Sequence, residues 1–397
     1  MNRTAGRPVG RLIVGIFVVF IAFQGVSAAD KPLRVSLFPY VPDGALIRNV
    51  IKTRWDALNT GVDLDLTTYS QWDCYSTDPP ADLDVFETDS IMLDYFVHNN
   101  NAATLSPEAV SASEDFFDFA WTGSMVDGRL YGVPRLLCTN VLFCRKGDAE
   151  IEAATSLYDI YKRLGNSSDA ADCPQANKGM LIDMKGGTTC ACLYLNAEED
   201  LAGAYQLFPQ LPRADALDAK GTGNVVLLLK MAGRKQALHV DPPVPDRAAW
   251  FSQGFGRVYA GYSERLYFMD PASHANVRVR SLPLAKKTVN LFFVDMLCIN
   301  TTVRGKRRDL AMKLIDLCTS ADVAKACLMP SNGKPSQYLL PARESLYTDA
   351  QLIAAAPLYS DLLAIVKTNP GTFRLGPDGR RWLTTEKPLI QAILFRP

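Results

Sequence analysis

One cysteine near the middle of the chain has surroundings that suit nucleophilic chemistry. Cys138 opens an apolar, β-branched run, residues 138–143, and this pattern predicts a strand. A turn sequence at residues 131–134 precedes the run, and the basic segment 145–148 ends it. A thiol attacks as its thiolate, so a strand that carries a cysteine into a cleft can support a covalent step. The alternative is a small, inert, buried residue.

Two aspartates accompany predicted strands. Asp89 directly follows the strand predicted at residues 83–88, in the kind of position where α/β sheets place ligand contacts. Asp295 falls inside the apolar run 289–299. A carboxylate inside a buried strand is costly unless it is paired. We therefore interpret Asp295 as a functional residue.

Strands and helices alternate along the chain, which is typical of an α/β fold. A helix predicted at residues 43–59 joins the first two strands as a parallel crossover. The predicted strands are residues 33–38, 62–69, 83–88, 138–143 and 289–299. Further predicted helices are residues 156–164, 197–207, 308–317 and 321–329, with a short apolar element at 225–231 and more helix near the C-terminus.

The first 29 residues have the pattern of a signal peptide. Arg3, Arg7 and Arg11 precede the apolar run 12–23, and small residues follow at 26–29. The run is shorter than the roughly 20 residues that span a bilayer, so we expect an exported protein, periplasmic or secreted, without a stable membrane anchor.

Size and charge narrow the class of protein further. About 370 residues remain after the leader, which suits two lobes better than one core. Lys and Arg number 42, as do Asp and Glu, and no basic patch indicates a nucleic-acid partner.

Several common chemistries lack their motifs. His98, His239 and His274 are widely separated and form no zinc-type pair. Residues 261–265 lack the second glycine of a serine-hydrolase elbow, and residues 185–189 are not a phosphate-binding loop. We therefore expect no metal and no cofactor.

The nine cysteines are an odd number, so at least one has no internal partner. Cys318 and Cys327 are close enough in sequence for a local bridge, and Cys173, Cys190 and Cys192 offer a second source of a pair. The connectivity stays open.

Short motifs in a fixed order resemble one family. They are Leu-Phe-Pro-Tyr-Val-Pro-Asp at 37–43, Gln-Trp-Asp-Cys-Tyr at 71–75, Asp-Val-Phe-Glu-Thr-Asp at 84–89, the segment 131–146 around Cys138, Gly-Tyr-Ser-Glu at 261–264 and Phe-Val-Asp at 293–295. Together they resemble thiaminase I (thiamine pyridinylase), an exported enzyme built on the two-lobed, type II periplasmic binding protein fold.

The resemblance implies a ligand cleft between two lobes, with hinge strands that cross between them. We expect residues 30–137 in the first lobe, 138–264 in the second and 265–330 back in the first. Residues 331–397 then supply C-terminal helices, mainly to the second lobe. Such proteins are commonly monomers.

The family's chemistry, carried over to this sequence, makes Cys138 the nucleophile and Glu264 the general base. The cysteine adds to the pyrimidine of thiamine, the thiazole leaves, and an amine or thiol attacks the bridging carbon. Ordinary pKa values near 8.5 for Cys and 4.3 for Glu make the proton transfer uphill by about 6 kcal/mol. A closed, partly dry cleft would narrow that difference.

The remaining site candidates fit a flat, cationic, nitrogen-rich ligand. Aromatic side chains can stack on the pyrimidine or lie against the thiazolium, and carboxylates can accept its hydrogen bonds. The aromatic candidates are Tyr40, Trp72, Tyr75 and Tyr262, and the acidic ones are Asp89, Asp118 and Asp295. Phe293 stands where the family tends to have tyrosine, and the lost hydroxyl removes a hydrogen bond worth about 0.5–1.5 kcal/mol.

These residues also have structural alternatives. Trp72 and Tyr75 suit a core position equally well, and Glu264 beside Arg265 suits a solvated surface. Asp43 and Asp73 are better explained as turn or helix-cap residues. For the whole protein, the alternative is a non-catalytic binding protein for thiamine or another pyrimidine, serving an importer, with Cys138 inert.

Overall fold

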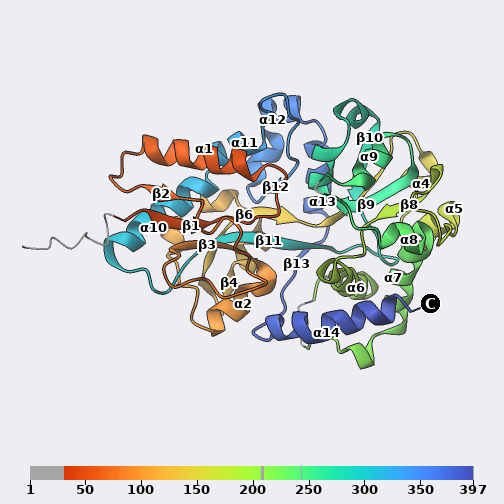
Figure 1. Cartoon of the computed structure of the whole chain (residues 1–397), viewed down its shortest axis with the longest axis horizontal. Coiled ribbons are helices and arrows are strands. Elements are labelled where there is room, and N and C mark those ends of the chain that lie inside the picture. The colour runs from red at the N-terminus through yellow and green to blue at the C-terminus, as the bar shows by residue number, and fades with distance from the viewer. Residues whose placement is uncertain (1–30, 207–209, 243, 397) are drawn as a thin grey trace, which may run out of the picture.

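The computed structural model describes residues 31–206, 210–242 and 244–396, and the predicted signal peptide lies outside them. The strands form two main sheets that lie side by side, one in each half of the molecule (Figure 1). The predicted two-lobed α/β fold is thereby confirmed. Among the described residues, no helix is both long enough and apolar enough to cross a membrane.

The first lobe is built on a seven-stranded sheet in the order β12-β6-β11-β3-β1-β2, with β13 paired to β11. Strand β1 pairs in parallel with β2 and β3, as the predicted crossover requires, whereas β11 is antiparallel to β3 and β6. All ten residues of β11 are buried. The strands are β1 Leu33–Ser36, β2 Leu64–Asp65, β3 Val85–Asp89, β6 Gly132–Cys138, β11 Asn290–Ile299, β12 Leu340–Pro341 and β13 Pro370–Thr372.

The second lobe is built on a four-stranded sheet in the order β10-β7-β9-β8. Only β8 and β9 run in parallel in this sheet. Its strands are β7 Asn140–Arg145, β8 Ala176–Ile182, β9 Gly256–Tyr262 and β10 Val277–Ser281. A small separate hairpin joins β4 Met125–Val126 to β5 Arg129–Leu130.

Helices cover the sheets with apolar faces. In α1, Ile47, Ile51 and Trp55 are buried at a spacing of four residues, and the carboxylate of Asp43 caps the first turn by accepting from the Leu46 amide at 3.0 Å. Helices α1, α10 and α11 lie on one side of the first sheet and α2 on the other (Figure 1). In the second lobe α7, α8 and α9 pack against β8 and β9.

The helices have the following bounds in chain order. They are α1 Gly44–Ala57, α2 Ser90–His98, α3 Asp118–Gly123, α4 Ala149–Glu152, α5 Leu157–Leu164, α6 Gly187–Ala202, α7 Ala219–Ala232, α8 Arg234–Ala237, α9 Asp246–Ser252, α10 Gly305–Thr319, α11 Ala321–Leu328, α12 Ala350–Ala355, α13 Tyr359–Lys367 and α14 Gly379–Leu394.

The chain crosses between the lobes at Cys138. Strand β6 of the first sheet ends at Cys138 and β7 of the second sheet begins at Asn140, so Thr139 alone separates them. The predicted turn at residues 131–134 is wrong, because the strand already begins at Gly132. Pro134 is tolerated there because β12 pairs only with Leu136 and Leu137, which leaves that edge of β6 unpaired at the proline.

Other predicted elements have different bounds in the structure. The strand predicted at residues 62–69 shortens to β2, because the carboxylate of Asp65 accepts from the amides of Thr67 and Thr68 at 2.9 and 3.0 Å and forms a turn. The helix predicted from residue 197 begins earlier, at Gly187, and Gly203 ends it with a φ of 78°. The predicted residue 207 lies outside the described residues. Residues 225–231 lie within α7.

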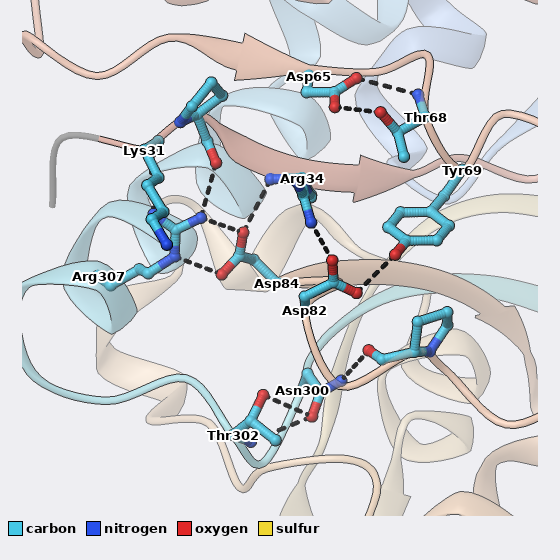
Figure 2. A network of polar contacts seen from close by, with 12 residues as sticks. Lys31, Arg34, Asp65, Thr68, Tyr69, Asp82, Asp84, Asn300, Thr302 and Arg307 are labelled. Atoms are coloured by element: carbon cyan, nitrogen blue, oxygen red, sulfur yellow. Dashed lines mark hydrogen bonds and ion pairs between the residues drawn. The ribbon is translucent and has the colours of Figure 1, made fainter. Parts of the chain in front are cut away.

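The buried carboxylate of Asp84 links strand β1 to helix α10 (Figure 2). Asp84 accepts from the backbone amide of Arg34 at 2.8 Å and from the Nε and Nη2 atoms of Arg307 at 2.5 Å each. Arg307, on α10, also donates to the carbonyls of Lys31 and Pro32 at 2.9 and 2.7 Å. The described N-terminal end of the chain is therefore tied to α10 through Arg307.

All nine cysteines are free thiols in the structure. The local bridge considered for Cys318 and Cys327 is absent, as is a pair among Cys173, Cys190 and Cys192, all of which belong to the described residues.

Candidate active site

The register of the two sheets gathers the predicted site residues. Cys138 at the end of β6 lies opposite Phe293 of β11, and Asp295 of β11 lies opposite Asp89 at the end of β3. In the second sheet Tyr262, the last residue of β9, pairs with Asn140. Strands from both lobes thus end beside the crossing.

These residues surround a cavity of about 740 Å³. This volume falls within the range of small-molecule sites. Eight of the ten residues predicted from the sequence line it, namely Tyr40, Tyr75, Asp89, Cys138, Tyr262, Glu264, Phe293 and Asp295.

Trp72 and Asp118 are not among the lining residues. The indole of Trp72 packs against Phe86 and Phe96, with ring centroids 5.8 and 6.4 Å apart, and its Nε1 donates to Thr77 at 3.1 Å. Asp118 is exposed at the start of α3. Trp72 was interpreted either as a ligand contact or as a core residue. In the structure it is half-buried and packs against the core.

Cys138 and Glu264 occupy matching positions beyond one ladder pair. Cys138 precedes Asn140 by two residues, and Glu264 follows its partner Tyr262 by two. Glu264 belongs to the short 3-10 segment Ser263–Phe268, which is held in place where the Ser263 hydroxyl donates to the carbonyl of Tyr338 at 2.7 Å. Both side chains line the cavity.

The environment favours the neutral forms of the thiol and the carboxyl. Burial, and then the charges of Glu264 and Asp295, raise the pKa of the Cys138 thiol well above its ordinary value, while Arg265 opposes the shift. Burial also raises the pKa of Glu264, again against Arg265. The thiol is therefore protonated in the free site, and Glu264 is a stronger base than an exposed glutamate.

Asp89 serves the fold and the cavity at once. One carboxylate oxygen caps α2 by accepting from the Ile91 amide at 2.8 Å, and the other accepts from the hydroxyl of Tyr75. Burial raises the pKa of Asp89 to about 6, although the bonds from Tyr75 and Ile91 lower it. Asp89, predicted at the end of its strand, thus caps helix α2 and also lines the cavity.

Asp295 is buried without a hydrogen-bond partner among the described residues, and only 5% of its surface is exposed. Burial raises its pKa well above the ordinary value, and the charges of Glu87 and Asp89 add to the shift. Arg135 opposes it from a buried ion pair in which its Nε and Nη2 donate to Glu87 at 2.6 and 2.8 Å. An unpaired acceptor of this kind is suited to a ligand donor.

Aromatic rings form the remaining walls. Tyr262 meets Phe293 edge to face at 6.4 Å, and its hydroxyl lies 3.4 Å from the hydroxyl of Thr189. Tyr40 is 62% exposed and donates to Asp73 at 3.2 Å. The arrangement offers ring faces and edges to a flat ligand.

Sequence reasoning missed several lining residues. Asp73 does form the predicted turn, accepting from the amides of Tyr75 and Ser76 at 2.8 and 3.0 Å, but it also lines the cavity. Its position in a motif between two aromatic candidates was the available signal. The other missed residues are Phe38, Val41, Pro42, Ser76, Asp183, Gly186, Thr188, Thr189, Arg265 and Phe268.

One group of possible metal ligands lies outside the cavity. Candidate ligand atoms of His239, Asp241 and Asp246 lie within 4.8 Å of one another. Arg247 already pairs with Asp241 at 2.8 Å, and Asp246 with His239 at 2.9 Å. The positive charge that a metal ion would supply is thus already present as a guanidinium.

Comparison with known sequences identifies a family. Residues 139–285 match the family model described as the Thiaminase-1 domain, which begins directly after Cys138 and includes Glu264. Over 396 residues the chain is 38% identical to Thiaminase-1 of Paenibacillus thiaminolyticus, a match that covers 96% of this chain and 94% of that protein.

Solved structures agree with the sequence match. Clostridium botulinum thiaminase I in complex with thiamin has a TM-score of 0.86 at 34% identity, covering 92% of this chain and all of that chain. Thiaminase I from Bacillus thiaminolyticus has a TM-score of 0.85 at 38% identity, covering 91% and 99% of the two chains. The maltose-maltodextrin binding protein of Alicyclobacillus acidocaldarius shares the fold alone, with a TM-score of 0.63 at 14% identity over 92% and 95% of the two chains. On its identity and coverage, the chain belongs to the thiaminase I family.

Proposed function

We propose that the protein degrades thiamine by transferring its pyrimidine-methylene group to an amine or thiol, with Cys138 as nucleophile and Glu264 as general base. The observation that carries this proposal is the placement of Cys138 and Glu264 two residues beyond the Asn140–Tyr262 pair, within one cavity. Family membership adds thiamine, since a relative with a TM-score of 0.86 is described in complex with thiamin.

The first half of the reaction forms the covalent intermediate. Glu264 accepts the thiol proton while the sulfur of Cys138 bonds to the pyrimidine ring. An electron pair of the ring then forms a double bond to the methylene carbon. The bond from the methylene carbon to the thiazolium nitrogen breaks, and the thiazole leaves as a neutral molecule. The positive charge of bound thiamine stabilises the thiolate, which the free site disfavours.

The second half regenerates the enzyme. The amine or thiol bonds to the methylene carbon and gives up its proton to a base in the site. The bond between the ring carbon and the sulfur of Cys138 then breaks, and the sulfur takes back the proton that Glu264 holds, which restores the thiol. Water competes poorly in a cavity from which closing lobes exclude it.

The acidic side chains that line the cavity fit a cationic substrate. Five of them contribute to the lining, against one guanidinium, that of Arg265. We assign hydrogen bonds from the aminopyrimidine to Asp89 and Asp295, and aromatic contacts to Tyr40, Tyr75, Tyr262 and Phe293. The acidic lining also raises the local concentration of a cation.

The deciding experiment compares the mature protein with a Cys138→Ser variant. Intact-protein mass spectrometry after incubation with thiamine alone should reveal a pyrimidine adduct in the first protein and none in the second. Thiazole release on adding an amine should disappear in the variant, while thiamine binding stays within about tenfold (about 1.4 kcal/mol). Tight binding of thiamine with neither signal in the unaltered protein would establish a binding protein for an importer instead.

We also propose that the protein acts outside the cytoplasm as a monomer. The leader pattern at residues 1–29 supports export. A mature N-terminus after residue 29 and a monomer mass of about 40 kDa in light scattering would agree with this. An uncleaved leader or a stable dimer would contradict it.

A further inference from the structure

The C-terminal helix α14, Gly379–Leu394, lies against both lobes. It packs on α2 of the first lobe and on α6 and α7 of the second. Figure 1 shows it along the lower edge of the molecule, running from below α2 to below α6. The helix therefore contacts elements on either side of the cleft.

Near its first turn, Arg380 holds a loop of the first lobe. Its Nη2 donates to the carbonyls of Cys74 and Thr77 at 2.9 and 3.0 Å, and its Nη1 pairs with the carboxylate of Asp78. The guanidinium also lies 4.2 Å above the ring of Tyr95, whose hydroxyl accepts from Nη1 at 3.2 Å. Only 17% of the Arg380 side chain is exposed, whereas its partner Asp78 is 48% exposed.

The loop that Arg380 holds carries two side chains of the cavity. Tyr75 donates its hydroxyl to Asp89, and Asp73 accepts from Tyr40. Both belong to the same turn, because Asp73 also accepts from the Tyr75 amide at 2.8 Å. Loss of the bonds to Cys74 and Thr77 would free this turn on the side away from the ligand.

About two to three turns later, the same helix holds the opposite wall. Gln391 donates to the carbonyl of Lys185 at 2.8 Å, and Lys387 donates to the hydroxyl of Thr188 at 3.3 Å. Gly186 and Thr188 line the cavity. Helix α14 therefore fixes the segments that carry both walls.

We propose that Arg380 is a positioning residue for the thiamine reaction, which orients Tyr75 and Asp89 toward the substrate from behind the cavity wall. Arg380 touches no lining position itself and acts through the loop 73–78. The inference rests on the proposed function. It assigns to α14 the task of keeping the aromatic and acidic contacts of the pyrimidine at their distance from Cys138.

The test compares Arg380→Gln with Arg381→Gln in the full mature chain. Arg381 is the adjacent residue on α14 and is 74% exposed, and its one ion pair within the described part of the chain is with Asp378 at 3.3 Å. Arg380→Gln should raise the KM for thiamine at least tenfold with a smaller change in kcat, because the lost contacts bind ground state and transition state alike. Arg381→Gln should leave both constants unchanged. Arg380→Lys should recover part of the loss, since an ammonium can replace one of the bonds.

The pH profile separates positioning from a general loss of stability. The bond from Tyr75 lowers the pKa of Asp89, so a displaced Tyr75 lets that pKa rise above about 6. Asp89 must be ionised to accept from the aminopyrimidine, so its pKa contributes to the acidic limb of kcat/KM together with that of Glu264. The limb should therefore move to higher pH in Arg380→Gln, and by the same amount in Tyr75→Phe. Asp89 interacts electrostatically with five other titratable groups, namely Tyr75, Cys74, Cys138, Cys192 and Asp295.

Two outcomes would overturn the proposal. One is an Arg380→Gln variant with the kcat, KM and pH profile of Arg381→Gln. The other is a loss of activity that follows a lower Tm alone, with an unmoved acidic limb. If the unaltered protein does not turn over thiamine, the proposed function fails separately, and the thiamine Kd of Arg380→Gln in a Cys138→Ser background still tests the positioning role.

Discussion

Cys138 and Glu264 stand at equal distances along the chain from one ladder pair. Each lies two residues beyond Asn140 and Tyr262, which pair where β7 and β9 begin and end. The β6–β7 crossing supplies the thiol and the end of β9 supplies the carboxylate. The backbone pairing of the second lobe thus sets the separation of the two groups that the proposed reaction needs.

Replacing Glu264 by Gln should lower kcat/KM for thiamine by about 10²–10⁴-fold, the usual contribution of a general base. Thiamine binding should stay within tenfold, because the side chain keeps its shape. Steady-state kinetics and calorimetric titration measure the two effects. Glu150→Gln, at a glutamate of α4 that is 67% exposed, is the matched control. A Glu264→Gln variant with normal turnover would remove Glu264 from the mechanism.

The pH dependence of the unaltered enzyme follows from the same carboxyl. A base must be deprotonated, and burial raises the pKa of Glu264 above its ordinary value. The acidic limb of kcat/KM in the free enzyme should therefore lie at a higher pH than an exposed glutamate would give. A rate that stays constant down to pH 4 would contradict this assignment.

Asp295→Asn should stabilise the protein while it weakens thiamine binding. Because burial raises the pKa of Asp295 in the folded state, the fold retains a proton that the unfolded chain releases near pH 4. This carboxyl therefore destabilises the fold increasingly as pH rises from about 4 toward its folded pKa. The gain in Tm should grow across that interval, as thermal unfolding between pH 5 and 8 would reveal. An equal gain at every pH would contradict the shift.

Phe293→Tyr should raise kcat/KM by a few-fold, up to about tenfold, if the added hydroxyl gains one hydrogen bond of about 0.5–1.5 kcal/mol. Phe293 lines the cavity opposite Cys138 and packs against Phe373 at 4.8 Å. Phe293→Leu keeps an apolar side chain and serves as the control for altered packing. A lower kcat/KM in the tyrosine variant would indicate that the cavity of this chain has no room or no partner for the hydroxyl.

Asp84→Asn should lower the free energy of unfolding by about 3–5 kcal/mol, because it leaves the Arg307 guanidinium without its buried carboxylate. Denaturant unfolding measures the loss, and the KM for thiamine should not change. Asp82→Asn is the control, since Asp82 is 56% exposed, and exposed pairs contribute about 1 kcal/mol or less. Equal losses in the two variants would show that burial gives the pair of Asp84 and Arg307 no greater weight than the exposed pair of Asp82 in Figure 2.

The sequence predicts best where one local pattern decides the outcome. The run around Asp295 is long and mostly apolar, so its strand was predicted within one residue at its start. The crossing at Cys138 was also expected, because the family resemblance places a hinge strand after the turn predicted at residues 131–134. The turn prediction was wrong because Pro134 lies in strand β6, at a point where the neighbouring strand β12 does not pair with it. A sequence pattern cannot show which positions of a strand lack a neighbour.

Long-range packing decides what the sequence leaves open. Trp72 has the neighbours of a ligand contact in sequence, but Phe86 and Phe96 surround it in space. Arg380 lies some 300 residues from the loop that it holds. Residues 185–189 lack the pattern of a phosphate-binding loop, and this test could not predict that three of them line the cavity. Such contacts depend on tertiary geometry rather than on periodicity.

The single residue between β6 and β7 has a consequence for how the cleft can open. If the lobes rotate about Thr139, each atom is displaced in proportion to its distance from that pivot. Cys138 adjoins the pivot directly, and Glu264 is connected to it through the pairing of Tyr262 with Asn140. Such a rotation would displace the Cys138 thiol and the Glu264 carboxyl little, so opening or closing would change access to them more than their alignment.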